Sequence, residues 1–180
     1  GTSSTGNSDG CPINTTTRSL HGQSIYTAAE LNAAGVYGPV QITHLGFYVN
    51  TASTLALTNF IIRMKHSTDA NVANWQSAAD LTTVYTNSSY TPVAGSYHML
   101  SMSTPFTWNG NDNILVDTAF ARSSGTSSAG TVRYTSLANG YLYVTGPQDR
   151  TNIFTGGSVS SLRPNIQISV SGSLPAPIPV

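Results

Sequence analysis

The sequence predicts an all-β fold, an antiparallel β-sandwich of about eight strands in a jelly-roll-like arrangement. Three observations predict it. Helical periodicity is almost absent, several short segments alternate apolar and polar residues, and clusters of Gly, Asn, Ser and Pro separate those segments. Short strands at this spacing are typical of sandwiches, and the jelly roll is a common eight-stranded form.

Alternation identifies the strands one by one. In 59–67, Phe60 and Ile62 share one face while Arg63 and Lys65 share the other, because side chains alternate along a strand. The predicted strands are 40–49, 59–67, 81–85, 96–103, 113–121, 131–136, 141–146 and 163–172. Helical composition occurs only in 26–35, where Gly35 ends the segment, and a second helical turn is considered for 69–81.

Length and charge limit the classes of function. The chain has 180 residues, which suits one domain, and its 7 Lys and Arg residues balance its 7 Asp and Glu residues. Only 8% of residues are charged, so the surface has no strong field for nucleic acid or anionic lipid. No apolar run reaches about 18 residues, so no membrane span is expected. This composition favours a protein outside the cell that packs against copies of itself.

The chain is predicted to have three parts. Residues 1–20 form an N-terminal arm, 21–172 form the β-sandwich domain, and 173–180 form a proline-rich apolar C-terminal arm. The loop 145–161 is long enough to be a binding loop.

No catalytic set is visible. Of the seven acids only Asp112 and Asp117 are close in sequence, and five residues apart on one strand they would point to opposite faces. The four histidines form no H-x-x-x-H or H-x-H pair, and no G-x-S-x-G elbow occurs. The expectation is therefore a protein that is not an enzyme and has no cofactor.

The stretch WNGNDN, 108–113, has two interpretations. Asn-Gly is the preferred centre of a tight hairpin, which makes this stretch a turn between two core strands. The alternative is a calcium site, since Asp112 and the neighbouring asparagines offer oxygen ligands. One carboxylate is a small charge for such an ion, so the turn is favoured. Cys11, the single cysteine, is read as a buried thiol, with pairing between chains as the alternative.

Aromatic residues offer contacts for a glycan or a protein partner. Trp75, Tyr141 and Tyr143 are the candidates, and the two tyrosines would share one strand face. Ring faces of this kind stack on the apolar faces of sugars.

Four phrases carry a resemblance to a known family. They are HGQSIYTAAEL (21–31), VQITHLGFYVN (40–50), TNFIIRMKHS (58–67) and YHMLSMSTPFTWNGNDNILV (97–116). In this order they resemble the β-sandwich domain that recurs in large secreted proteins of Bacteroidetes-type bacteria, many of them exported by type IX secretion. The last phrase matches the family pattern at Pro105, Phe106, Trp108, Gly110, Asn113, Leu115 and Val116. The resemblance implies a surface or adhesive module and brings no catalytic residues with it.

The final residues, LPAPIPV, are predicted to be a subunit interface. Alternate prolines favour an extended conformation with little entropy left to lose. The interface residues are Leu174, Pro175, Pro177, Ile178 and Val180. Docked on a neighbour they would bury ~300 Å², which contributes about 7 kcal/mol before ordering costs. Prolines cannot donate to a sheet, although an edge position tolerates them, and the alternative is folding back onto the same domain.

These features predict a non-catalytic structural subunit of an extracellular assembly, a filament or a surface layer. Its partners are copies of itself, joined by terminal-arm and β-sheet contacts. The alternative is a carbohydrate-binding or adhesive module of a secreted surface protein.

Overall fold

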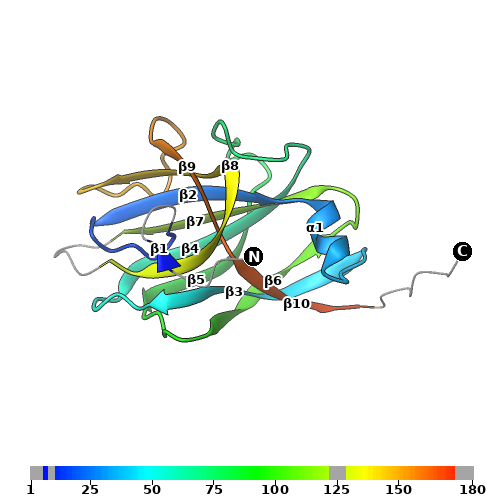
Figure 1. Cartoon of the computed structure of the whole chain (residues 1–180), viewed down its shortest axis with the longest axis horizontal. Coiled ribbons are helices and arrows are strands. Elements are labelled where there is room, and N and C mark those ends of the chain that lie inside the picture. Colours follow the sequence, from blue (N-terminus) through cyan, green and yellow to red (C-terminus); the bar gives the residue numbers. More distant parts are fainter. Residues whose placement is uncertain (1–5, 8–10, 122–128, 173–180) are drawn as a thin grey trace, which may run out of the picture.

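The computed structural model describes residues 6–7, 11–121 and 129–172. This part of the chain contains ten strands and one six-residue helix (Figure 1). The elements are β1 (Gly6–Asn7), β2 (Ser19–Tyr26), α1 (Ala28–Ala33), β3 (Val40–Thr51), β4 (Leu57–Ser67), β5 (Thr82–Tyr90), β6 (Tyr97–Trp108), β7 (Asn113–Ala121), β8 (Thr131–Gly146), β9 (Ser158–Pro164) and β10 (Ile166–Ser171). Every strand pairing is antiparallel, which confirms the predicted all-β antiparallel class.

The strands form one curled sheet in the order β10-β3-β8-β2-β7-β4-β5, with β6 also paired to β3 and both β1 and β9 paired to β8. Strand β8 has 16 residues and serves two regions of the sheet. Its first residues pair with β3, and its last residues pair with β2. The long strand thereby carries the sheet around the core. The finer description as a jelly-roll sandwich stays a prediction.

The hydrophobic core lies inside this curl. Leu45 on β3, Phe60 on β4, Trp108 on β6 and Phe120 on β7 are all fully buried and belong to one apolar cluster. These four strands contribute from distant parts of the sheet, so the curl brings their apolar faces together. Burial of side chains this large is the main favourable term in folding.

Most predicted strands are present with shifted ends. The strand 113–121 is observed with the predicted bounds. The predicted strands 131–136 and 141–146 are one strand, β8, with a register shift between Ser136 and Tyr141 opposite β9. The predicted strand 163–172 is two strands, β9 and β10, which pair with β8 and β3 respectively.

The helix α1 follows from its first turn. Thr27 is the N-cap, and its side chain accepts from the Glu30 backbone N–H while the Glu30 carboxylate accepts from the Thr27 N–H. Gly35 follows the helix with a φ of +82°, a conformation that glycine adopts without strain. The second predicted turn of helix, 69–81, is wrong, because this segment contains no helix.

The predicted N-terminal arm, 1–20, is wrong for its second half. Cys11 and Ile13 are fully buried in the core cluster, and Ser19 begins β2. Residues 11–20 therefore belong to the folded domain, because their apolar side chains complete its core. The predicted C-terminal arm, 173–180, lies outside the described residues.

The predicted Asn-Gly hairpin is also wrong. The turn joins β6 to β7, but β6 pairs with β3 while β7 pairs with β2 and β4. The chain at 109–112 therefore crosses from one region of the curled sheet to another. It is still a turn between two core strands, and only Gly110 of the Asn-Gly pair has a positive φ, +84°.

Helix length bears on membrane insertion. Within 6–7, 11–121 and 129–172, no helix has the length and apolar character needed to cross a bilayer.

We expect the Cys11 thiol to be unreactive in the folded protein. Burial raises the pKa of this thiol to about 12, so little thiolate forms, and the residue has 0% exposure, so a reagent cannot reach the sulfur atom. A water-soluble disulfide reagent at mildly alkaline pH should modify the guanidinium-unfolded chain fully and the native chain only at the rate of unfolding. Rapid modification of the native chain would contradict the buried position and reopen pairing between chains.

Candidate functional site

The three aromatic residues predicted to bind a glycan or partner do not form a shared exposed surface. Tyr141 is 2% exposed, and it stacks on Tyr143 with ring centroids 5.6 Å apart. Trp75 packs its ring against His21, 4.7 Å between centroids, and its Nε1 donates to the Gly156 carbonyl at 2.7 Å. Tyr141 is thus wrong as a surface contact, because its ring is buried, while Trp75 and Tyr143 are partly exposed.

The candidate calcium ligand, Asp112, takes part in an internal turn. Its carboxylate accepts from Asn109 Nδ2 at 2.7 Å, and its carbonyl accepts from Trp108 Nε1 at 2.7 Å. Asn109 Oδ1 in turn accepts from the backbone N–H groups of Asn111 and Asp112. Across the described part of the chain no three His, Cys, Asp or Glu side chains gather as a metal site would require. The oxygens of this stretch are therefore satisfied as a turn.

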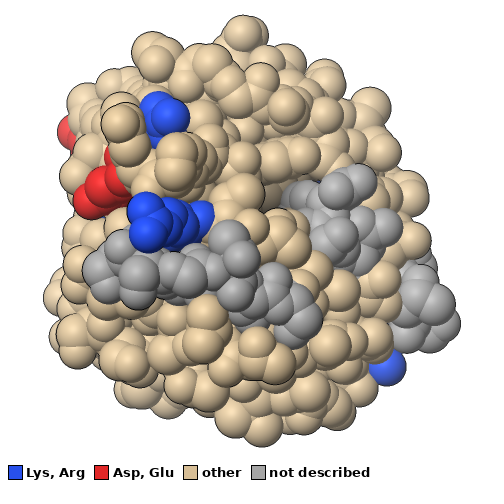
Figure 2. Space-filling view, turned by 90° about the vertical axis from the view of Figure 1, so that its left-hand side faces the viewer, with Lys and Arg blue, Asp and Glu red and all other residues tan. Residues whose placement is uncertain are grey.

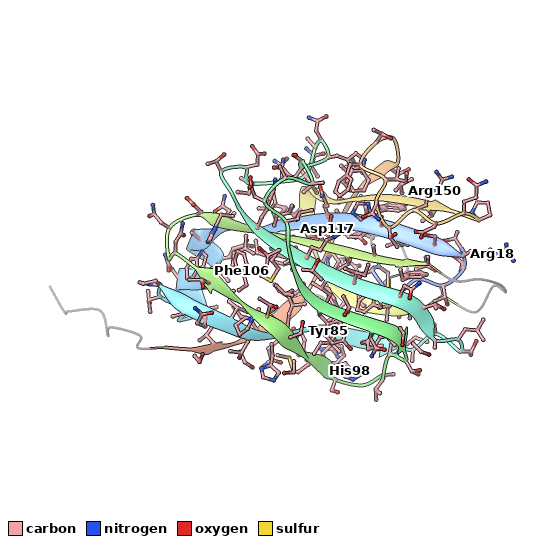
Figure 3. All side chains as sticks on the ribbon, turned by 180° about the vertical axis from the view of Figure 1, so that it is seen from behind. Arg18, Tyr85, His98, Phe106, Asp117 and Arg150 are labelled. Atoms are coloured by element: carbon pink, nitrogen blue, oxygen red, sulfur yellow. The ribbon has the colours of Figure 1, made fainter. Side chains whose placement is uncertain are left out.

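A buried polar cluster that the sequence did not predict lies around Asp117. On β7, Asp117 is flanked by Gln23 of β2 and Arg63 of β4 in the strand register. Its Oδ1 accepts from Arg63 Nε at 2.8 Å, and its Oδ2 accepts from Gln23 Nε2 at 2.9 Å and contacts His21 Nε2 at 2.7 Å. Figure 3 shows Asp117 on the sheet beneath the loops that cover this face.

Arg63 and His21 keep the buried Asp117 side chain in its charged form. Burial alone raises the pKa of Asp117, but the His21 hydrogen bond and the charges of His21 and Arg63 outweigh it and hold the pKa below its ordinary value. His21 Nδ1 lies 2.7 Å from the Ile153 carbonyl, which can only accept. The two His21 nitrogens thus lie against two acceptors, Asp117 Oδ2 and the Ile153 carbonyl.

This cluster fastens two loops onto the sheet. Arg63 donates to the Thr151 carbonyl at 2.6 Å and to the Asn152 side chain at 2.9 Å, and Gln23 Oε1 accepts from the Gln76 N–H at 2.8 Å. His21 and Asp117 have no exposed surface. Every polar side-chain atom of the pair lies against a protein group, so the arrangement holds the loops to the sheet.

A second feature, open to solvent, is lined by residues of α1 and β10. These two elements lie near one end of the molecule (Figure 1). We call this feature the edge groove. It has a volume of about 380 Å³, and it is lined by Tyr26, Glu30, Leu31, Ala34, Val36, Thr135 and residues 163–168. Its lining includes three consecutive residues of β10, 166–168, and no residue of β3, the strand with which β10 pairs.

Arg163 and Glu30 build one wall of the edge groove. Arg163 NH1 donates to Glu30 Oε2 at 2.9 Å, and NH2 donates to Glu30 Oε1. The guanidinium carbon lies 4.7 Å from the centre of the Tyr26 ring, and NH1 also donates to the Ile25 carbonyl. The hydrogen bond from Arg163 lowers the pKa of Glu30 to about 2. This pair fixes α1 to the end of β9.

The apolar residues of the edge groove are incompletely buried. Ile166, Ile168 and Val170 alternate along β10 and pack against the core, but each remains partly exposed. Val36 beyond α1 is in the same state. Among the described residues β10 pairs with β3 alone. The core is therefore left open along the free edge of this strand.

Comparison with models of protein families, with curated proteins and with solved structures finds no match. The resemblance to the β-sandwich domain of secreted Bacteroidetes-type proteins stays a prediction.

Replacing Asp117 with Asn should destabilise the domain by about 3 kcal/mol, because Arg63 would lose its buried counter-charge and His21 would lose its carboxylate partner. Urea unfolding followed by circular dichroism measures the change. Asp80→Asn is the matched control, since Asp80 is exposed with a φ of +66° that asparagine also adopts. Equal stability of the two variants would contradict the structural role of the cluster.

Glu30 should make the free energy of unfolding depend on pH in the acid range. Its pKa is lower in the folded protein, about 2 against an ordinary 4.5, so its stabilising contribution is complete above about pH 4.5 and is lost as the pH falls toward 2. Glu30→Gln keeps a capping side chain but removes the charge. The variant should be less stable near neutrality and should lose less stability between these pH values than the parent chain. Urea unfolding at several pH values measures the free energy of unfolding of both chains. If this free energy falls equally with pH in the parent chain and in Glu30→Gln, the pair with Arg163 is not formed.

Proposed function

We propose that this domain is a non-catalytic structural subunit of an extracellular assembly, a filament or surface layer. Its copies join through β-sheet contacts and through the apolar segment 174–180. The observation that supports this proposal is the free edge of β10, where half-buried apolar side chains accompany backbone groups that no described strand pairs.

An open strand edge is a binding feature unless the protein protects it. Natural edges carry charged side chains, prolines or bulges that discourage another strand from pairing. The sequence of β10, IQISVS, has neither a charge nor a proline. The register shift between Ser169 and Val170 places the extra residue, Thr43, on β3 and not on β10. At the other end of the strand order, β5 lies against β6, where Ser103 Oγ donates to the Val84 carbonyl at 3.3 Å. Strand β10 thus combines an unprotected edge with a groove.

The electrostatics of the surface are consistent with self-association. Figure 2 shows one face on which few Lys, Arg, Asp or Glu residues interrupt uncharged ones. Two copies with such surfaces repel each other little, and their contact would depend on apolar burial and backbone hydrogen bonds. Localisation outside the cell is part of the proposal, and it is supported by the low charge and by the family resemblance.

We expect the full chain to associate in a concentration-dependent manner, and we expect association to be nearly independent of salt because few charges are involved. Sedimentation velocity measures particle size, and electron microscopy shows whether the particles are polymers. Deleting residues 173–180 should abolish association while circular dichroism shows an unchanged fold. A chain that stays monomeric at every concentration would refute this function. Polymers that survive the deletion would refute the role of segment 173–180 in joining the copies.

A further inference from the structure

We propose that the segment 174–180 of a second copy adds to β10 as a further strand and fills the edge groove. This inference deepens the proposed function and rests on it. It identifies the receiving site, the donated segment and the hydrogen-bonding edge that joins them.

The spacing of the prolines suits a strand that pairs on one side only. Along any strand, the backbone N–H and C=O of alternate residues point to the same neighbour. Pro175, Pro177 and Pro179 lack N–H groups, and because they alternate, all three missing donors fall on one edge. The residues between them, at 174, 176, 178 and 180, keep their donors on the opposite edge. The segment can therefore pair fully with β10 and present a donor-free edge to solvent.

The same alternation sorts the side chains. Leu174, Ala176, Ile178 and Val180 lie on one face of an extended strand, and the prolines lie on the other. The added strand can run in either direction along β10. In one of these directions, the backbone N–H groups of residues 174, 176, 178 and 180 point to β10 while their side chains face the core. They would then continue the apolar face of Ile166 and Ile168, which is now incompletely buried. Leu31 and Val36 line the opposite side of the groove.

Length and chain direction favour a second copy over the same one. Strand β10 has six residues and the segment has seven, so at about 3.3 Å per residue they match. For the segment to pair with its own β10, the chain would have to reverse at Gly172 and the residue after it. Gly172 has a φ of +121°, whereas a two-residue reversal needs about +60°. A Cβ atom added to Gly172 would lie 3.8 Å from the Val40 Cα, so the chain still follows β3 there.

A pair of substitutions in the full chain tests the hydrogen-bonding edge. Ala176→Pro removes a donor from the edge that pairs, leaves an acceptor of β10 unpaired, and should weaken association about a hundredfold. Pro177→Ala adds a donor to the solvent edge and should change association by no more than about fivefold. Sedimentation velocity measures both variants, and thermal unfolding confirms that neither alters the domain. A segment that binds only because it is apolar would respond little to either substitution.

A second pair tests the groove. Ala34 is exposed and lines the edge groove, while the neighbouring Ala33 is exposed and does not line it. Ala34→Arg should weaken association strongly by occupying the groove, and Ala33→Arg should not. As a direct probe, the fluorescent peptide GSLPAPIPV should bind the full-length Ala176→Pro chain and should not bind it when Ala34→Arg is also present. The peptide GSLPPAIPV, of the same composition with a proline at position 176, should not bind either chain.

The outcomes separate this inference from the proposed function. If the full chain associates but Ala34→Arg and Ala33→Arg behave alike, the edge groove is not the site and the structural function stands. If it associates but the two proline variants behave alike, the segment does not add to β10 as a strand, and the structural function again stands. If the full chain is monomeric and the peptide does not bind, both fail. If the full chain is monomeric yet the peptide binds the Ala176→Pro chain, the segment docks on its own copy, which overturns the contact between copies.

Discussion

The constraint on which this structure depends is that strand backbones need hydrogen-bonding partners on both edges. A curled sheet of ten strands meets it for most of the chain, because β8 pairs with one set of strands early in its length and with another set later. The same curl buries the large apolar side chains of β3, β4, β6 and β7. Among the described residues, β10 is a strand of this sheet that pairs on one side only and whose apolar side chains are incompletely buried. The free edge and the open core are therefore one feature with one cause.

Two of the seven acids of this chain fasten parts of the fold to one another. Asp117 pairs with Arg63 and His21, and Glu30 pairs with Arg163. The first cluster holds two loops on the outer face of the sheet, and the second holds α1 beside β10. The chain has only 7 acids and 7 basic residues, and these contacts pair two of each. Low repulsion between copies follows from this small and balanced number of charges.

Sequence patterns predicted local structure well and pairing poorly. The run at 113–121 has β-branched and apolar residues bounded by a polar turn, and it forms β7 as expected. By contrast, Asn109-Gly110 predicted a hairpin because that rule assumes neighbouring strands pair, whereas β6 pairs with β3 from far along the chain. Asn139-Gly140 resembled a break, yet β8 continues through it with Asn139 at a φ of +54° and a shifted register.

The candidate sites depend on the same non-local information. No pattern marks Asp117 as the neighbour of Gln23 and Arg63, because that relation exists only in the strand register. The strand β2 was not among the predicted strands, because its sequence, SLHGQSIY, does not alternate apolar and polar residues; all eight of its residues are buried. Tyr141 was predicted as a contact because alternation gives a shared face without saying which face is covered.

What sequence did supply is the alternation of prolines, and its meaning depends on the edge that the fold leaves free. An unprotected strand edge can recruit further edges without limit, which leads to cross-β aggregation. A donated strand whose outer edge has no donors would stop that growth after one addition. Each copy would then give one segment and receive one, so that growth proceeds from copy to copy by a heterologous contact. The unprotected sequence of β10 and the prolines at 175, 177 and 179 make physical sense as the two halves of one limited junction.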